Sequence, residues 1–381
     1  MRVAIVYDAV YPHVKGGAER RYYELALRLA ARGHDVHWYG MHYWDGPAVQ
    51  RREGITYHGV CRPLPLYTAS GRRSIVQALV FGLACLKLVR RRYDVIDCCG
   101  FPFFSLFSAR VAVAVRGGML ISTWHEVWGA AYWKAYLGRL GFAGAAVERL
   151  AARIPHLIVA VSKATARRVS SDLLRGRVVQ TLPNGVDAAQ IELSLRSTQA
   201  YDIAYAGRIC DFKDLELLIE ALTQVLAQRP GTTCLILGDG PHRELLEAFA
   251  VAVGVADAVT FTGFVEDQAE FYGMLKSCRV FALPSRREGF GIVVLEANAA
   301  GVPVVVVDHP DNHARDLIGA ANGEVVAPEP AALADALLRL LGEVPQARAS
   351  ACRAVARQHD WDSIAVRYEQ VLENSRGEAL V

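Results

Sequence analysis

Apolar runs of strand length alternate with segments of helical periodicity along most of the chain. In the first half the candidate strands are 3–8, 35–40, 55–60, 94–100, 119–124, 157–162 and 178–182, and the candidate helices are 18–32, 72–92, 103–116, 131–153 and 163–174. Strands and helices that alternate in this way are typical of a parallel sheet with helical crossovers. The alternation therefore predicts an α/β fold with a doubly wound parallel sheet.

The alternation breaks once and then starts again. A turn at 183-PNGVD-187 is followed by the polar, weakly periodic stretch 188–200, as at a linker. Further candidate strands are 201–207, 233–240, 259–265, 279–285, 303–308 and 323–328. A chain of 381 residues also exceeds what one hydrophobic core usually supports. We therefore expect two Rossmann-like domains that face each other across a cleft, 1–187 and 201–358, joined by the linker 188–200.

The last residues, 359–381, predict one more amphipathic helix. Its apolar positions recur at the helical period, at Trp361, Ile364, Ala365, Tyr368, Val371 and Leu372. We expect this helix to pack back on the first domain.

Charge is distributed unevenly between the two halves. Residues 1–185 hold 26 Lys and Arg against 11 Asp and Glu, whereas residues 186–381 hold 16 against 28. A basic first domain favours an anionic partner, such as a phospholipid surface or a phosphorylated acceptor. Nucleic acid is disfavoured, because no aromatic residues interleave with the basic ones on a sheet. The eight cysteines lack metal-binding spacing and indicate buried thiols in a reducing cytoplasm. The excess of arginine over lysine, with abundant alanine, indicates a bacterial gene rich in G and C.

The segment 284-PSRREGFGIVVLEANAAGVPVV-305 combines a glycine-rich turn with a helix and an apolar strand. Glu288 and Glu296 are eight residues apart, a helical spacing that lets both carboxylates face one cleft. Gly289 and Gly291 flank Phe290, and small residues there let a ligand approach free amides at a helix N-terminus, where an anion is favoured. Two acceptors for hydroxyl groups and an anion site together suit a sugar nucleotide.

Arg208 and Lys213 follow the first strand of the second domain and could bind a diphosphate as a leaving group. Alone, the pair is better explained by a solvated lysine and an arginine paired with Asp211 or Asp214. Beside the Glu288 segment, diphosphate binding becomes the favoured interpretation.

Three further turns are candidates for ligand contact. Gly16 and Gly17 precede the first helix and expose amides that suit a phosphate or sugar, but without GxGxxG spacing they do not indicate a nicotinamide cofactor. The turn 238-GDGP-241 is explained by helix capping. Gly263 and Val265 end a strand, where their backbone could contact a base.

His125 ends a strand between Trp124 and Trp128. A structural histidine is the alternative, but a strand's carboxyl end favours the cleft. Asp360 and Asp362 form a DxD sequence, which helix capping explains better than a metal site.

The segment 72–92 is an apolar helix with basic ends, too short and too polar to span a bilayer. Burial against the sheet is the default interpretation. Peripheral attachment to the inner membrane face through Arg72, Arg73 and Arg90 to Arg92 is the alternative for an otherwise cytoplasmic protein.

These motifs, in this order, resemble the retaining glycosyltransferases of family 4, which have the two-domain GT-B fold. The resemblance covers nearly the whole chain, through GGAER at 16–20, His125, PNGVD, Gly207-Arg208 with Lys213, GDGP, GFV at 263–265 and E-x(7)-E from Glu288 to Glu296.

The resemblance implies a role for each matching residue. Arg208 and Lys213 would bind the donor diphosphate, Glu296 the ribose hydroxyls, and Glu288 with the backbone of 289–291 the donor sugar. Gly16 and Gly17 would border the phosphate and acceptor, and His125 the reacting centre. No metal or other cofactor is expected.

The implied activity is transfer of a hexose from a nucleotide sugar, with UDP the favoured nucleotide ahead of GDP and dTDP, to a hydroxyl of a glycan, lipid carrier or small natural product. A sugar-nucleotide epimerase, a phosphorylase and a non-catalytic nucleotide-sugar-binding partner are the alternatives.

Overall fold

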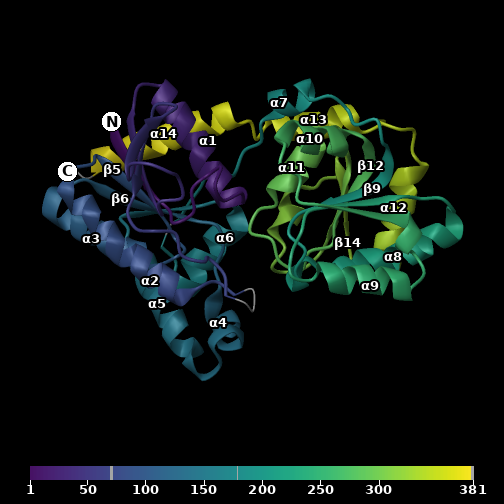
Figure 1. Ribbon diagram of the computed structural model, residues 1–381, viewed down its shortest axis with the longest axis horizontal. Coiled ribbons are helices and arrows are strands. Elements are labelled where there is room, and N and C mark those ends of the chain that lie inside the picture. Colours follow the sequence, from purple (N-terminus) through teal and green to yellow (C-terminus); the bar gives the residue numbers. More distant parts are fainter. Residues whose placement is uncertain (69–71, 178, 379–381) are drawn as a thin grey trace. The chain divides into compact units, whose positions relative to one another are not determined.

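The computed structural model describes residues 1–68, 72–177 and 179–378, so Val178 of the predicted strand 178–182 lies outside the described residues. The chain divides into two compact units, each with its own parallel sheet (Figure 1). Unit 1 comprises Met1–Asn184 with Trp361–Val381, and unit 2 comprises Gly185–Asp360. The α/β prediction with two doubly wound sheets is confirmed.

Unit 1 contains an eight-stranded sheet in the order β3-β4-β2-β1-β5-β6-β7-β8. Its strands are β1 Arg2–Val6, β2 Asp35–Gly40, β3 Val49–Arg52, β4 Ile55–Gly59, β5 Val95–Cys99, β6 Met119–Trp124, β7 Leu157–Ala160 and β8 Gln180–Thr181. All pairs are parallel except β3 with β4. Strand β3 was not predicted, because VQRR lacks an apolar alternation and pairs only at the sheet edge.

Helices cover both faces of this sheet. They are α1 Gly17–Ala31, α2 Ile75–Ala84, η1 Cys85–Arg90, α3 Phe104–Arg116, α4 Gly129–Leu137, η2 Gly138–Leu140, α5 Gly141–Arg153, α6 Lys163–Arg168, the π-helical turn η3 Val169–Leu173, and α14 Trp361–Glu378. The segment 72–92, predicted as one helix, forms α2 followed by the 3-10 helix η1. Helices α2 to α5 pack on one sheet face, and α1 with α14 pack on the other.

Unit 2 contains a six-stranded parallel sheet in the order β11-β10-β9-β12-β13-β14. Its strands are β9 Tyr201–Ala206, β10 Cys234–Leu237, β11 Val259–Gly263, β12 Cys278–Leu283, β13 Val304–Val307 and β14 Gly323–Val326. The chain moves outward from β9 to β11 and then returns to add β12 on the other side of β9. The strand order therefore reverses between β9 and β12, which is where such sheets bind ligands.

The helices of unit 2 precede, separate and follow these strands in sequence. They are α7 Ala188–Leu193, η4 Asp211–Lys213, α8 Leu215–Gln228, α9 Arg243–Ala252, η5 Ala256–Ala258, α10 Gln268–Lys276, α11 Ile292–Ala299, η6 His313–Leu317, α12 Pro330–Gly342 and α13 Ala349–Arg357. Among the described residues, no helix is long and apolar enough to cross a bilayer.

The segment 188–200, expected as a linker, is part of unit 2 and contains α7. The Lys276 ammonium donates to the carbonyls of Ile191, Glu192 and Ser194 and so fixes the C-terminal end of α7 to α10. The chain passes from unit 1 to unit 2 after Asn184, before the polar stretch rather than within it.

The terminal helix α14 belongs to unit 1 and packs beside α1. Its apolar stripe is buried in the core, at Trp361, Ile364, Ala365, Tyr368 and Leu372. The Tyr368 hydroxyl donates to Asp97 Oδ2 at 2.6 Å, and Thr123 Oγ1 donates to the same carboxylate at 2.9 Å. Asp97 is fully buried, and burial raises its pKa against the effect of these hydrogen bonds.

We expect Tyr368→Phe to lower the free energy of unfolding by about 1.5–3 kcal/mol, because it removes a hydrogen bond to a buried carboxylate. Tyr23→Phe is the matched control, since the Tyr23 hydroxyl donates at 3.0 Å to the exposed Glu53. There the expected change is about 0.5 kcal/mol or less. Urea unfolding of both variants measures the difference, and equal losses would contradict a structural role for the Tyr368–Asp97 contact.

Candidate functional site

The predicted residues of unit 2 lie in the loops that follow neighbouring strands. Arg208 and Lys213 follow β9, Gly263 ends β11, and Glu288 follows β12. Because these strands are parallel, their carboxyl ends meet at one edge of the sheet. The structure therefore brings this part of the predicted set together.

Lys213 and Glu288 form a direct ion pair between the loops after β9 and β12. Both side chains are largely buried, with 15% and 13% of their surface exposed. The sequence analysis expected Lys213 either in solvent or on a diphosphate, and the structure instead places it on the predicted sugar-binding carboxylate. Because the pair is partly removed from water, the attraction between its two charges is stronger than it would be at the protein surface.

The contacts of Glu288 use one of its two oxygens. Lys213 Nζ donates to Glu288 Oε1. The Ser285 hydroxyl donates to the same oxygen at 3.2 Å. Among the hydrogen bonds of the described residues, none involves Oε2. The carboxylate is thus held in a fixed orientation while one oxygen remains available as a hydrogen-bond acceptor.

Arg286 ties the same two loops together from the outside. Its backbone N–H donates to the Phe212 carbonyl at 2.9 Å, and its guanidinium contacts Asp211 at 3.1 Å and Asp214 at 3.3 Å. Arg286 therefore pairs with the two aspartates that the sequence offered as partners for Arg208.

Asn312 is a buried residue that the sequence analysis missed. Its side-chain amide donates to the Ser285 carbonyl at 2.9 Å and to the Val307 carbonyl at 3.0 Å. The backbone of Glu288 also pairs with the segment around Asn312. Asn312 therefore positions the loop that carries Glu288, and a single asparagine in a polar loop gives no sequence signal for such a role.

The helical spacing argument for Glu288 and Glu296 is wrong. Helix α11 begins at Ile292, so Glu288 lies in the preceding loop and only Glu296 follows the helical repeat. Gly291 caps this helix with φ +83°, and a Cβ there would approach the Ala314 Cβ to 2.5 Å. Both the backbone conformation and the packing thus require glycine at this position.

The N-terminus of α11 has no side-chain cap. The Phe290 side chain is buried, with its ring 6.2 Å from that of His359, so only its backbone could contact a ligand. With Gly289 and Gly291 on either side, this turn leaves backbone amides at a helix N-terminus, where the helix dipole favours an anion.

Glu296 lies inside α11 and is 9% exposed. The Tyr272 hydroxyl, on the neighbouring α10, donates to Glu296 Oε1 at 3.4 Å. This contact is long for a hydrogen bond between two oxygen atoms. Its predicted role toward ribose hydroxyls remains a prediction.

The glycine turns after β9, β10 and β11 contact one another through their backbones. Gly207 N donates to the Leu237 carbonyl, Ile209 N to Asp239, and Gly238 N to Gly263, all at 2.9 Å. These contacts explain the GDGP sequence as a packing requirement. They also place the exposed Arg208 and the half-buried Val265 on adjoining turns of the same edge.

In unit 1, Gly16 and Gly17 start helix α1, as predicted from the sequence. A Cβ on Gly16 would approach Glu19 Oε2 to 2.4 Å, because the Glu19 carboxylate folds back over the start of its own helix. The Glu19 carboxylate therefore lies beside the N-terminus of α1, where it accepts a hydrogen bond from its own backbone N–H.

Glu19 is the titratable group of this region that the sequence analysis did not assign. It is 9% exposed, and the Tyr7 hydroxyl donates to its Oε1 at 3.3 Å. Burial raises the pKa of Glu19 to about 7, and the hydrogen bonds from its own backbone and from Tyr7 oppose that shift. Glu19 can therefore gain or lose a proton near neutral pH.

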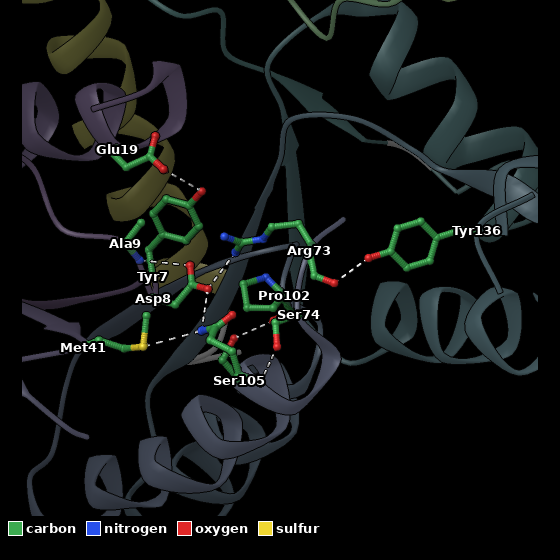
Figure 2. A network of polar contacts seen from close by, with 11 residues as sticks. Tyr7, Asp8, Ala9, Glu19, Met41, Arg73, Ser74, Pro102, Ser105 and Tyr136 are labelled. Atoms are coloured by element: carbon green, nitrogen blue, oxygen red, sulfur yellow. Dashed lines mark hydrogen bonds and ion pairs between the residues drawn. The ribbon is translucent and has the colours of Figure 1, made fainter. Parts of the chain in front are cut away.

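A buried polar network extends from Glu19 toward α2 (Figure 2). The fully buried Asp8 pairs with Arg73 at 2.7 Å and accepts from Gln77 Nε2 at 2.9 Å. Burial raises the pKa of Asp8, while the charge of Arg73 and the Gln77 hydrogen bond lower it. The Tyr136 hydroxyl donates to the Arg73 carbonyl, which ties α4 to the same network.

His125 follows β6, and its ring lies 6.3 Å from that of Tyr22 in α1. Its Nε2 is buried and has no hydrogen-bond partner among the described residues. Burial, with a smaller contribution from the positive charge of Arg21, lowers the pKa of His125 to about 3. The imidazole is therefore neutral near pH 7 and can act as a hydrogen-bond donor or acceptor, but not as a cation.

The DxD residues hold no metal-like cluster. Asp362 pairs with Arg28 at 2.6 Å, and Asp360 pairs through its backbone with Val186. Within the described part of the chain, no three His, Cys, Asp or Glu side chains are grouped as metal ligands would be. All eight cysteines are free thiols.

Comparison with known proteins extends these observations. Residues 15–190 match the family described as Glycosyltransferase Family 4, and residues 188–359 match Glycosyl transferases group 1. The chain is 33% identical over 208 residues to a glycogen synthase of Mycobacterium tuberculosis, a match that covers 52% of this chain and 50% of that protein. The chain thus spans about half the length of that relative.

A longer match is to the phosphatidyl-myo-inositol mannosyltransferase of Mycobacterium leprae, 30% identical over 371 residues, covering 94% of this chain and 93% of that protein. Among solved structures, sucrose-phosphate synthase of Thermosynechococcus elongatus superposes with a TM-score of 0.80 at 19% identity, covering 98% of each chain. The Anabaena protein HepE, in complex with UDP and glucose, superposes at 0.73 and 20% identity, covering 98% of this chain and 100% of that one. The structures show the shared fold, the matching sequences run along nearly the whole chain, and the chain belongs to the family 4 glycosyltransferases of the GT-B fold.

Proposed function

We propose that this protein transfers a hexose from a nucleotide-diphosphate sugar to an acceptor hydroxyl, with retention of the anomeric configuration. The observation that carries the proposal is the Lys213–Glu288 pair beside the uncapped N-terminus of α11. One arrangement there supplies a cation, free amides and a carboxylate oxygen at the strand-order reversal of unit 2. These groups match a diphosphate next to a sugar.

Unit 2 would act mainly on the leaving group. As the bond between sugar and diphosphate breaks, negative charge grows on the diphosphate and positive charge on the sugar. The negative charge on the diphosphate would be stabilised by Lys213, Arg208 and the backbone amides of 289–291. Glu288 would hold a sugar hydroxyl through Oε2. The acceptor hydroxyl would then attack from the same face, and a diphosphate oxygen would take its proton.

The donor nucleotide is proposed as UDP. The Anabaena structure contains UDP and glucose, whereas a Mycobacterium tuberculosis relative, 32% identical over 243 residues, is named for GDP-mannose. The fold and the charged groups of unit 2 suit either diphosphate. Divalent metal is not required in this proposal, because Lys213 and Arg208 supply the positive charge.

Unit 1 would contact the acceptor. His125 offers a neutral, buried ring nitrogen without a protein partner, and Glu19 offers a carboxyl group that titrates near neutral pH. Both follow strands at the carboxyl edge of their sheet. The net positive charge of residues 1–185 favours an anionic or membrane-borne acceptor.

We expect one nucleoside diphosphate among UDP, GDP, dTDP and ADP to raise the thermal unfolding temperature of the protein, with or without magnesium. At a ligand concentration of about 100 times Kd, the stabilisation is about 2.7 kcal/mol, or roughly 5–10 °C. Lys213→Ala and Glu296→Ala should abolish the shift, because they remove a diphosphate contact and a ribose contact.

Lys163→Ala and Glu270→Ala are the matched controls for this experiment, since both side chains are exposed and lie outside the proposed site. They should retain the full shift. A shift that persists in Lys213→Ala would contradict the proposed diphosphate site. Donor turnover without any acceptor would favour an epimerase, and a requirement for free phosphate would favour a phosphorylase.

Glu19→Gln should stabilise the protein at pH 8 and have a smaller effect near pH 4.5. The pKa of Glu19 is about 7 in the folded state and about 4.3 in an unfolded chain. Unfolding therefore releases a proton between these values, and the wild type loses stability as the pH rises through that range. Glutamine cannot ionise, so the variant should gain about 1–3 kcal/mol at pH 8, measured by urea unfolding.

Glu24→Gln is the comparison variant, because Glu24 lies on the same helix with similar burial and pairs with Arg28 at 2.6 Å. Its replacement should lower stability at pH 8 rather than raise it. Parallel stability curves for wild type and Glu19→Gln would show that Glu19 does not titrate near neutrality.

A further inference from the structure

The outer surface of α2 and η1 exposes an unusual number of large apolar side chains. Six of them are between 39% and 69% exposed: Ile75, Val76, Leu79, Val80, Leu83 and Leu86. Their spacing places them together on one side of the helical segment. None of them belongs to the candidate site.

The opposite side of the same segment is apolar as well. Ala78, Phe81, Cys85 and Leu88 are buried in the core of unit 1. The sequence predicted that the segment 72–92 is buried against the sheet. That prediction is confirmed for these inner side chains, but the outer side chains of the segment are exposed. A surface helix of a water-exposed protein normally turns a polar side outward, so the outer side of α2 calls for a partner.

Helix α3 extends this surface. It packs closely on α2, because Gly82 allows contact with Phe104 and accepts a hydrogen bond from Ser108 Oγ at 2.6 Å. On its outer side, Val111 and Val115 are 45% and 61% exposed. We call these two valines and the six side chains of α2 and η1 the apolar face, and Figure 1 shows the two helices side by side.

Basic residues are frequent in the segments that carry the apolar face. Between residues 54 and 125 the chain has nine Lys and Arg but only two acidic residues, Asp94 and Asp97, and Asp97 is fully buried. The exposed basic side chains are Arg72 before α2, Lys87 and Arg90 in η1, Arg91 and Arg92 directly after η1, and Arg110 and Arg116 in α3. An apolar surface with exposed basic side chains on the same helices complements an anionic lipid surface.

We propose that the apolar face docks this protein peripherally on an anionic lipid bilayer. The aliphatic side chains would enter the boundary between headgroups and acyl chains, and the basic side chains would remain among the headgroups. A protein partner fits less well, because protein interfaces are enriched in aromatic residues and all eight side chains here are aliphatic. The docking goes beyond the proposed transfer and does not depend on it.

The test is sedimentation of the full chain with phosphatidylcholine vesicles that contain or lack phosphatidylglycerol. Binding should require phosphatidylglycerol and should decrease as NaCl is raised. Val76→Glu with Leu83→Glu should reduce the bound fraction about tenfold or more, because two of the most exposed apolar side chains are lost to charge. Both positions are exposed at the surface, so the fold should be retained.

The matched control is Val251→Glu with Leu245→Glu on α9 of unit 2. These residues are 66% and 65% exposed, against 69% and 67% for Val76 and Leu83. The control changes the same residue types and the same net charge on a helix of the other unit. It should bind vesicles like the wild type.

Three results would overturn the inference: wild type that does not bind phosphatidylglycerol vesicles, equal loss in both double variants, or self-association in solution that only Val76→Glu with Leu83→Glu abolishes. The last result would assign the apolar face to a second copy of the chain. The nucleotide thermal shift, measured on the same double variants, should remain intact. Its absence in the wild type would contradict the proposed function and leave the vesicle result standing.

Discussion

The ion pair between Lys213 and Glu288 determines where unit 2 presents its charged groups to a ligand. It joins the loops after β9 and β12, the two strands between which the strand order reverses. Arg286 and Asn312 hold the same loops from either side through hydrogen bonds to backbone and carboxylate groups. Because the pair is largely desolvated and its supports are fixed, the lysine and the carboxylate are positioned before any ligand binds.

The two glycine-rich helix N-termini of this chain are used differently. In α1 the Glu19 carboxylate lies beside Gly16, and burial there raises the pKa of Glu19 to about 7. In α11 no side chain caps the amides after Gly291. Both turns have the same kind of glycine-rich sequence, but in the structure a carboxylate lies beside the N-terminus of α1, where it would repel a second anion. This difference supports assigning the diphosphate to unit 2 and a hydroxyl-bearing group to unit 1.

The sequence predicted the fold well because burial on both faces of a parallel sheet produces apolar runs such as Val304–Val307 in β13. The sequence contains no sign of β3, which is a polar edge strand. It also placed the linker between the two units at 188–200, whereas Lys276 binds the end of α7 in that segment to unit 2. Such contacts join residues far apart in the chain and leave no local pattern.

For the candidate site, the sequence identified the charged residues but not their arrangement. Lys213 and Glu288 were both predicted, yet their contact spans 75 residues, and the helical spacing used for Glu288 fails because α11 starts after it. Asn312, Glu19 and the Asp8–Arg73 pair were missed because each acts through burial and a distant partner. The type of a single residue predicts neither its burial nor a partner that lies far away in the chain.

A crystal structure of the protein soaked with UDP-glucose tests the central claim most directly. The account predicts the diphosphate at the amides of 289–291, within hydrogen-bond distance of Lys213 Nζ, and a sugar hydroxyl on Glu288 Oε2. A diphosphate bound elsewhere, with the α11 N-terminus empty and Lys213 still paired only with Glu288, would contradict it.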